Sequence, residues 1–453
     1  MKDANFMREN NARHFWAPMA HPAELQAAPP IIVARGEGVD IEDIDGHRVL
    51  DGVGGLWCTN LGHSSQVVKD AITRQLEILP YYNTFRSTTN MPTIELSYLL
   101  REYFAPEGLT RCFLTSGGSD SVETALRLAR QFHRVNGEPE RTKFFSLMRG
   151  YHGTHFGGAS VNGNANFRRN YEPMLPGCIH LPAPFLYRNE FDLQDGEALV
   201  RAIARRFEQE VEFQGANTVA ALIMEPVLGA GGVIVPPASL FPTMRAICDK
   251  HGILLISDEV ITAFGRVGEA CGARLWGIKP DILTSAKAIT NGYFPLGAVM
   301  ITDRVAQAFE ANKDTRATIS HGYTYSGHPA GAAAAVATLG ELKRLNVAAN
   351  AKTQGQTLLK GFEALAAKYE IIGNVRGQGL MLAMELVSDR TNKTPVNKAI
   401  VQAFFDATYA EGLMVRTSGN NIIVSPALVI TDGDSAKMLG CIEAGLIAAS
   451  RLL

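Results

Sequence analysis

Short apolar segments that alternate with amphipathic ones limit what this chain can fold into more than any other feature of its sequence. Between residues 111 and 302 each apolar segment is short enough for a strand and is separated from the next by a helical or loop segment. Strands with nearly all-apolar sequences are buried on both faces, as in parallel sheets covered by helices. The pattern therefore predicts an α/β fold built on a parallel or mixed sheet. The expected strands are residues 111–116, 142–148, 218–226, 253–260, 281–287 and 295–302.

Helical periodicity marks several of the connections between these strands. Residues 120–137 give the clearest example, a strongly amphipathic helical pattern that ends at Gly137. Further helices are expected at residues 66–79, at 94–104 and in a segment that ends at Gly252. Residues 151–192 are instead rich in Gly, Asn and Pro, which predicts an irregular stretch of the kind that often lines active sites.

The pattern changes after about residue 329, where a long helix, antiparallel strands and a final helix are expected. This order is typical of a smaller α+β domain. Residues 31–51 alternate apolar with polar residues around an Asp45-Gly46 turn, which predicts a hairpin that we place with the smaller domain. The expected division is an N-terminal segment of the small domain (1–60), a large domain (61–329) and a C-terminal small domain (330–453).

Composition and charge exclude several classes of protein. The chain is 46% hydrophobic and 19% charged, which is ordinary for a globular protein. A net charge of −2 without any block of like charge argues against nucleic acid or anionic membrane as a partner. The N-terminus lacks a signal-peptide core, and no apolar run is long enough to span a bilayer. The six cysteines are scattered without metal-ligand spacing, so we expect reduced thiols, no metal site and a cytoplasmic protein.

A glycine-rich turn between a strand and a helix offers a phosphate site. In Ser116-Gly117-Gly118-Ser119-Asp120 the glycines let a phosphate approach the backbone, and the helix N-terminus offers free N–H groups. Ser119 adds a hydroxyl donor. A plain Ser/Asp helix cap after a glycine turn explains the same residues. The turn is neither a G-x-G-x-x-G fingerprint nor a Walker A loop, which weakens the dinucleotide and nucleotide interpretations.

Charged residues end three further apolar strands, where ligands of open α/β sheets bind. Asp258 is costly to bury unless a cation such as a protonated pyridinium nitrogen pairs with it. Lys287 would be partly desolvated, which lowers the pKa of its amine as a Schiff-base nucleophile requires. Glu225 either hydrogen-bonds beside a ring or orients a loop. Each residue also has a simpler explanation when it is taken singly. Asp258 could cap the loop that follows its strand, and Lys287 could be a solvated surface charge.

An aromatic residue completes the set. Tyr151, followed by His152, comes after the strand at 142–148 and either stacks on a flat heterocycle or packs within its loop. Phosphate turn, aromatic, carboxylate and amine follow one another in chain order at successive strand ends. As a set they indicate a pyridoxal phosphate site more strongly than any one member does.

At these residues the chain resembles the class III (ω-amino acid:pyruvate) aminotransferases of the fold-type I pyridoxal-phosphate superfamily. The resemblance runs from about residue 15 to the C-terminus. It implies a large domain with a mostly parallel seven-stranded sheet flanked by helices. It also implies pyridoxal 5′-phosphate as cofactor, and ping-pong transamination between a small amine donor and a keto acid, pyruvate, through pyridoxamine phosphate. The motifs that carry it are TSGGSDSVETAL, RGYHG, MEPVLGAGGVIVPP, LLISDEVITAFGRVGE, PDILTSAKAITNGYFPLGAV and SHGYTYSGHP.

The resemblance also implies roles for single residues. Lys287 would hold the cofactor as a Schiff base and move the proton, and Asp258 would pair with the ring nitrogen. Tyr151 and Val260 would contact the two ring faces. Thr324 would reach the phosphate of the other subunit, which implies a homodimer with shared sites that could pair into a tetramer. The expected cofactor-binding residues are Gly118, Ser119, Tyr151, His152, Glu225, Asp258, Val260, Lys287 and Thr324.

One position departs from the family. Gly117 stands where relatives often have a serine, so the phosphate loses one hydroxyl donor.

Substrate specificity is expected to depend on aromatic walls and one arginine. Arg416 matches an arginine that binds the substrate carboxylate and swings outward for other substrates, although a surface arginine is the alternative. Arg86 lies beside Phe85 where relatives can have an aromatic residue, and it is either a second carboxylate binder or a solvated side chain. The residues expected to line the substrate pocket are Trp57, Phe85, Tyr151 and Arg416, with Trp16 and Met19 at its border.

Three other interpretations stay open. A decarboxylase, racemase or aminomutase of the same fold shares most of these residues, although Arg416 and Trp57 favour amino transfer. A nicotinamide-dependent dehydrogenase would need G-x-G-x-x-G after its first strand, which we do not find. A non-catalytic binding protein gives no reason for Lys287 at a strand end. Candidate donors are β-alanine, other ω-amino acids, polyamines, taurine and aryl-alkyl amines.

Overall fold

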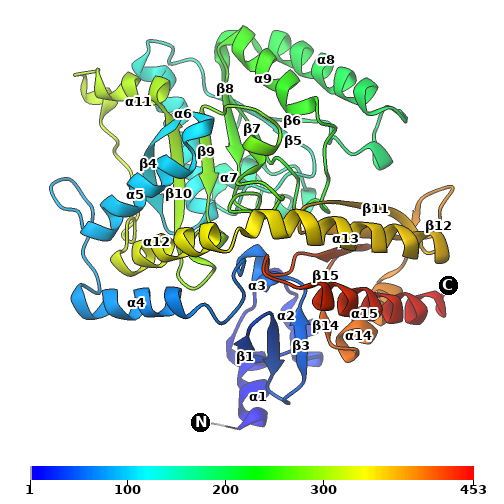
Figure 1. Cartoon of the computed structure of the whole chain (residues 1–453). Helices are drawn as coiled ribbons and strands as arrows, with labels where there is room; N and C mark the ends of the chain where they lie inside the picture. Colours follow the sequence, from blue (N-terminus) through cyan, green and yellow to red (C-terminus); the bar gives the residue numbers. More distant parts are fainter. Residues whose placement is uncertain (1–2) are drawn as a thin grey trace.

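A seven-stranded mixed sheet forms the centre of the molecule (Figure 1). The computed structural model describes residues 3–453. Only β10 runs antiparallel to its neighbours, whereas the remaining pairings are parallel, in agreement with the expected mostly parallel sheet. The strands, in order across the sheet, are β4 (Leu109–Thr115), β10 (Gly297–Thr302), β9 (Ile282–Ser285), β8 (Leu254–Asp258), β7 (Val219–Met224), β5 (Lys143–Leu147) and β6 (Cys178–Leu181).

Helices bury both faces of this sheet because its central strands are apolar on both sides. In β7, Ala221 and Ile223 pack in one core with α6, α7 and α11, whereas Leu222 and Met224 belong to a second core with α8 and α9. The helices of this part of the chain are α4 (Gln66–Ile78), α5 (Met91–Tyr103), α6 (Gly118–Val135), α7 (Phe156–Val161), α8 (Gly196–Gln214), α9 (Leu240–His251), α10 (Gly272–Leu275), α11 (Asp303–Glu310) and α12 (Pro329–Arg344).

One strand of the sheet lies where an irregular stretch was expected. Within residues 151–192 the chain forms α7 and the edge strand β6, which pairs in parallel with β5. Three of the four residues of β6 are only half-buried, and one of them is His180. The prediction was wrong here because an edge strand lacks the continuous apolar run by which the central strands are recognised.

The N-terminal segment forms a small sheet of its own. Residues 31–51 make two successive antiparallel pairings, with turns at Gly38 and Gly46, where a single hairpin was expected. Strand β3 then pairs in parallel with β14 from the C-terminal part, which joins the two ends of the chain. The elements are α1 (Ala4–His14), α2 (Pro22–Ala27), β1 (Val33–Glu37), β2 (Asp40–Asp43), β3 (Arg48–Asp51) and α3 (Gly54–Trp57).

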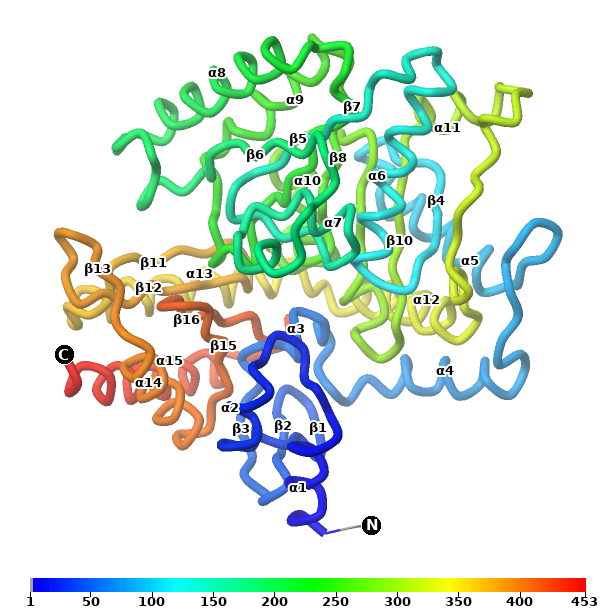
Figure 2. Tube along the Cα trace, turned by 180° about the vertical axis from the view of Figure 1, so that it is seen from behind, coloured from blue at the N-terminus to red at the C-terminus, as the bar shows by residue number. Residues whose placement is uncertain are grey.

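The C-terminal part contains a third, antiparallel sheet in the order β11-β12-β16-β15, with β13 added to β12. The long helix α13 runs past the lower edge of the central sheet, and α15 lies beside α14 (Figures 1 and 2). The domain boundaries drawn from the sequence stay a prediction. The elements are α13 (Val347–Lys368), β11 (Ile372–Gln378), β12 (Met381–Asp389), β13 (Thr394–Pro395), α14 (Lys398–Ala410), β14 (Leu413–Met414), β15 (Arg416–Ser418), β16 (Asn421–Val424) and α15 (Asp432–Ser450).

Within residues 3–453 no helix is both long enough and apolar enough to cross a membrane. All six cysteines are free thiols, and each is buried or half-buried.

Candidate active site

Several of the predicted residues meet around one hollow of about 130 Å³ at the carboxyl ends of the central strands. They come from the N-terminus of α6 and from the ends of β5, β7, β8 and β9. Parallel strands bring their carboxyl ends to one edge of a sheet, so residues far apart in the chain become neighbours. The residues that line this hollow are Gly118, Ser119, Val122, Tyr151, His152, Gly153, Glu225, Asp258, Val260, Ile261 and Lys287.

A buried histidine fixes the carboxylate of Asp258. Asp258 is the last residue of β8 and only 3% of it is exposed. His152 Nδ1 lies 2.8 Å from Asp258 Oδ2, and the other oxygen accepts hydrogen bonds from Val260 N (3.2 Å) and Thr284 Oγ1 (3.1 Å). These contacts fix the position of the buried Asp258 carboxyl group. Such a carboxylate favours a cationic partner in the hollow.

Lys287 approaches the same hollow two residues after the end of β9. Its backbone takes the left-handed conformation, with a φ of 52°, at the start of the short turn that follows the strand. Burial lowers the pKa of its amine, while Cys58 and Asp258 nearby act in the opposite direction. Because burial is the larger effect, a larger fraction of Lys287 is neutral, and therefore nucleophilic, than for a lysine in water.

Glu225 connects two loops around the hollow. Its carboxylate accepts hydrogen bonds from Tyr151 N at 2.8 Å and from Gly229 N at 2.9 Å. Burial raises the pKa of Glu225 to about 7, and the neighbouring Asp258 acts in the same direction. Glu225 therefore positions the loop that carries Tyr151, whose own pKa is raised by burial.

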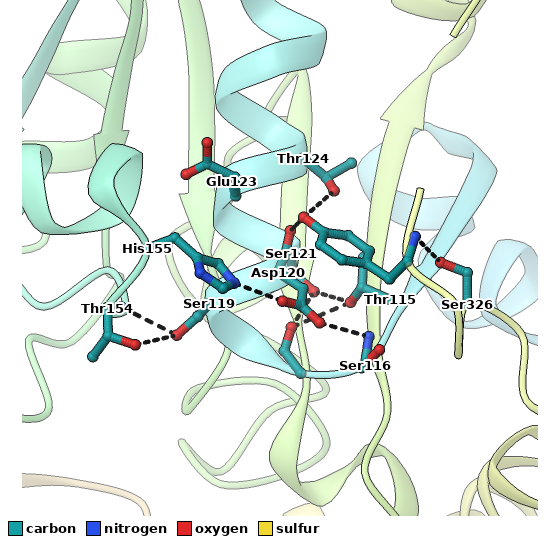
Figure 3. A network of polar contacts seen from close by, with 12 residues as sticks. Thr115, Ser116, Ser119, Asp120, Ser121, Glu123, Thr124, Thr154, His155 and Ser326 are labelled. Atoms are coloured by element: carbon teal, nitrogen blue, oxygen red, sulfur yellow. Dashed lines mark hydrogen bonds and ion pairs between the residues drawn. The ribbon is translucent and has the colours of Figure 1, made fainter. Parts of the chain in front are cut away.

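The N-terminus of α6 also lines the hollow, through Gly118 and Ser119. Figure 3 shows the polar contacts of this helix end. Ser119 Oγ accepts a hydrogen bond from Thr154 N at 3.2 Å. A Cβ atom on Gly118 would lie 2.8 Å from Val260 Cγ1, so only glycine allows this approach of the helix to the β8 loop. Below the turn, Ser121 Oγ contacts Thr115 Oγ1 at 2.7 Å. Free backbone N–H groups and a serine hydroxyl at the start of a long helix suit a phosphate group.

These residues fit pyridoxal 5′-phosphate. The N-terminus of α6 with Ser119 lines the hollow, and the buried carboxyl group of Asp258 offers an acceptor for a ring nitrogen. Tyr151 and Val260 are in its wall, and Lys287 supplies the amine.

A wider hollow of about 840 Å³ shares Tyr151, Ile261 and Lys287 with the first. Trp57 and Arg416, two of the residues expected to line a substrate pocket, are in its wall. Burial lowers the pKa of Arg416, and the proximity of Tyr151 opposes this shift. A substrate held here has both the amine of Lys287 and the guanidinium of Arg416 within one enclosure.

The two residues expected at the border of the pocket have different positions. Met19 lines the wider hollow, whereas Trp16 is 81% exposed and is not among the residues that line it.

Sequence reasoning missed the contribution of the N-terminal sheet to this wall. Asp51 and His63 line the wider hollow and contact each other at 3.0 Å. Asp51 also accepts hydrogen bonds from Val53 N and Gly55 N, which fixes the turn that leads to Trp57. A carboxylate at the end of an apolar strand was again the available signal, since Asp51 closes β3.

The remaining predicted residues lie on another surface. Phe85 and Arg86 line a hollow of about 740 Å³, and a Cβ atom on Gly322 would lie 3.2 Å from the Phe85 ring. Thr324 belongs to the same loop as Gly322 and is exposed. None of these three predicted residues lines either hollow at Lys287. In a single chain the structure therefore does not bring Phe85, Arg86 and Thr324 to Lys287.

Comparison with known proteins identifies the class. The family model for class-III aminotransferases matches residues 22–446, and the chain belongs to this family. The protein is therefore a pyridoxal-phosphate-dependent aminotransferase.

Individual relatives span nearly the full chain. A putrescine–pyruvate aminotransferase of Pseudomonas aeruginosa is 34% identical over 418 residues, which are 92% of this chain and 90% of that protein. A PLP-bound amine transaminase from an uncultivated Pseudomonas species is 46% identical, with a TM-score of 0.94 over 96% of this chain and 98% of that one. An (S)-enantioselective ω-transaminase of Thermomicrobium roseum is 36% identical, with a TM-score of 0.95 over 99% of both chains.

Proposed function

We propose that this aminotransferase moves amino groups from primary amines or ω-amino acids to pyruvate. The observation that supports the proposal best is the pair of joined hollows. Lys287 is common to both, the phosphate and ring-nitrogen contacts lie in one, and Arg416 with Trp57 lies in the other. The relatives act, by their names, on putrescine, γ-aminobutyrate and other amines, which favours a donor whose amine is remote from any carboxylate.

Each residue then has a defined task. The cofactor, when bound, supplies the electron sink for the substrate carbon that loses its proton. Lys287 Nζ removes that proton and later returns it, and burial favours this role because it lowers the pKa of the amine. Asp258, held in place by His152, would pair with the ring nitrogen. Gly118 and Ser119 would bind the phosphate, and Tyr151 and Val260 would contact the ring.

Arg416 takes different positions for substrates with a carboxylate and for substrates without one. It binds the carboxylate of pyruvate through its planar guanidinium, which matches a carboxylate in two-point contact. It turns away from the pocket when an amine without a carboxylate occupies the same space. The partial burial of Arg416 beside Tyr151 strengthens the first contact, since charge interactions are stronger away from water.

A second copy of the chain completes the site. Phe85 and Thr324 line neither of the two hollows at Lys287 of their own chain, and both are exposed. Met91, Ile94 and Tyr98 form an exposed apolar row along α5, at a spacing that places them on one face of the helix. A row of exposed apolar side chains of this kind is typical of a surface that packs against another protein chain. We place Thr324 and Phe85 in the active site of the other subunit of a homodimer, and the enzyme in the cytoplasm.

A panel of amine donors with pyruvate as acceptor tests this function. Putrescine, β-alanine, γ-aminobutyrate, taurine and an aryl-alkyl amine are each incubated with the enzyme, and alanine is measured. At least one donor is expected to yield alanine in equal amount to the donor consumed. Release of carbon dioxide without alanine would instead identify a decarboxylase of the same fold. Arg416→Ala is expected to raise the KM for pyruvate more than the KM for a donor without a carboxylate.

A further inference from the structure

The loop that carries Thr324 is attached to the phosphate-binding helix of its own chain through Tyr323. The Tyr323 hydroxyl donates a hydrogen bond to the backbone carbonyl of Asp120 at 2.9 Å and lies 3.2 Å from Thr124 Oγ1. Both partners are in the first turns of α6, directly after Gly118 and Ser119 (Figure 3). The loop therefore takes its position from the same helix end that faces the phosphate.

Further bonds fix the loop on either side of Thr324. Tyr323 N donates to Ser326 Oγ at 3.2 Å, and Ser326 N donates to the Tyr323 carbonyl at 2.9 Å. The Tyr81 hydroxyl donates to the Thr324 carbonyl at 2.8 Å. The side chain of Thr324 is left exposed, and within residues 3–453 its hydroxyl makes no hydrogen bond. The backbone of Thr324 is held in place while its hydroxyl stays free for a partner.

We propose that Tyr323 is a positioning residue that aligns Thr324 with the cofactor phosphate of the partner subunit, using α6 of its own subunit as the reference. The inference rests on the proposed function, in which Thr324 serves the other subunit. It adds that the two phosphate sites of the dimer are physically connected. The helix that binds one phosphate holds, through the Tyr323 hydroxyl, the threonine that binds the other.

Tyr323→Phe removes this hydroxyl and keeps the ring. The holoenzyme is dialysed, and the fraction of subunits that retain cofactor is followed by visible absorbance. Loss of the two hydrogen bonds of this hydroxyl is expected to weaken retention about three- to tenfold. Tyr325→Phe is the matched control, because Tyr325 lies two residues away, is 58% exposed, and its hydroxyl makes no hydrogen bond within the described residues. It should retain cofactor like the parent enzyme.

A double variant separates this inference from the proposed function. Thr324→Ala is expected to weaken retention by itself. If Tyr323 acts through Thr324, adding Tyr323→Phe to Thr324→Ala should weaken retention little further. If Thr324→Ala has no effect, the shared site of the proposed function is wrong and this inference falls with it. If Thr324→Ala weakens retention and Tyr323→Phe does not, only the inference is wrong.

Mixed dimers show whether the effect crosses the subunit boundary. One subunit carries Lys287→Ala, so borohydride can attach cofactor only to the other. Tyr323→Phe placed in the Lys287→Ala subunit should lower labelling of the intact partner by the same factor, about three- to tenfold. Tyr323→Phe placed in the labelled subunit should change its labelling much less. The opposite pattern would show that Tyr323 merely supports its own helix, and would overturn the proposal.

Discussion

Burial controls the charge of the residues around Lys287. Two carboxyl groups and one amine share the small hollow, namely those of Glu225, Asp258 and Lys287. Asp258 is compensated by His152 and two further hydrogen bonds, whereas Glu225 has only backbone donors and its pKa rises to about 7. The site therefore holds one carboxylate ready for a cationic ring and a second one that titrates near neutrality.

Replacement of Lys287 by alanine tests the proton transfer. Lys287→Ala should lower transamination by at least about a thousandfold, since it removes both the amine that holds the cofactor and the base. Stopped-flow measurement of a single half-reaction provides the rate. Lys279→Ala is the control, because Lys279 is exposed and lines neither hollow. A Lys287→Ala enzyme with the parent turnover would refute the assignment.

The pKa of Glu225 predicts a pH dependence of stability. Its usual value of 4.5 rises to about 7 on folding, so the folded state binds more protons between these pH values and loses stability as the pH rises through them. Glutamine does not titrate, so Glu225→Gln removes this pH-dependent loss of stability. It also lowers the stability by an amount that does not change with pH, because one hydrogen bond is weakened. The free energy of unfolding of the cofactor-free variant, relative to the parent, should therefore rise by up to about 3 kcal/mol across this window. A difference that does not change with pH would contradict the burial effect.

At the scale of elements, the strand ends around the site are packed without spare room. Gly297 begins β10, and a Cβ atom there would lie 2.4 Å from Thr115 Oγ1 and 2.6 Å from Ser121 Oγ. These hydroxyls lie beneath the phosphate turn and contact the carbonyl of Gly117. A larger residue at the start of β10 would therefore displace side chains that support the phosphate turn at residues 116–120.

A pair of glycine substitutions tests this packing. Gly297→Ala should destabilise the protein by about 1–3 kcal/mol through overpacking and should also weaken cofactor retention. Gly340→Ala, in α12 where nothing lies within 4 Å, should be neutral or stabilise by up to about 1 kcal/mol. Thermal unfolding monitored by circular dichroism measures both. Equal effects of the two substitutions would show that the turn is not under this constraint.

The elements differ in how far they could be predicted from sequence. The central strands and α6 were predicted to within a few residues, because continuous apolar runs and strong amphipathic periodicity come from burial within one chain. The edge strand β6 lacked that signal. The site residues could likewise be predicted only where the sequence carries a local signal. Asp258 and Lys287 are polar residues at apolar strand ends, whereas His63 acquires its position only when the N-terminal sheet folds over the wider hollow.

At the scale of the whole molecule, one chain leaves the predicted site in two parts. The cofactor residues from Gly118 to Lys287 surround one hollow, and Phe85 with Thr324 lies on another surface. No pattern within a single sequence reports which residues meet across a symmetry axis. That part of the prediction came from family resemblance, and it requires a second subunit.

A charge in the apolar row of α5 tests the dimer. Ile94 is 58% exposed in the single chain, between Met91 and Tyr98, so Ile94→Lys should place an unpaired charge in the interface. Sedimentation should show monomers, and the cofactor should be retained less well because Thr324 no longer reaches it. Phe213→Lys is the control, since Phe213 is 83% exposed at the far end of α8. If both variants stay dimeric, this face of α5 is not the interface.

The measurement that tests the central claim most directly is reduction of the yellow holoenzyme with borohydride, followed by digestion and mass spectrometry. We expect one pyridoxyl group per chain, on the peptide that contains Thr284, Ser285 and Lys287. A label on any other lysine, or no label at all, would contradict it.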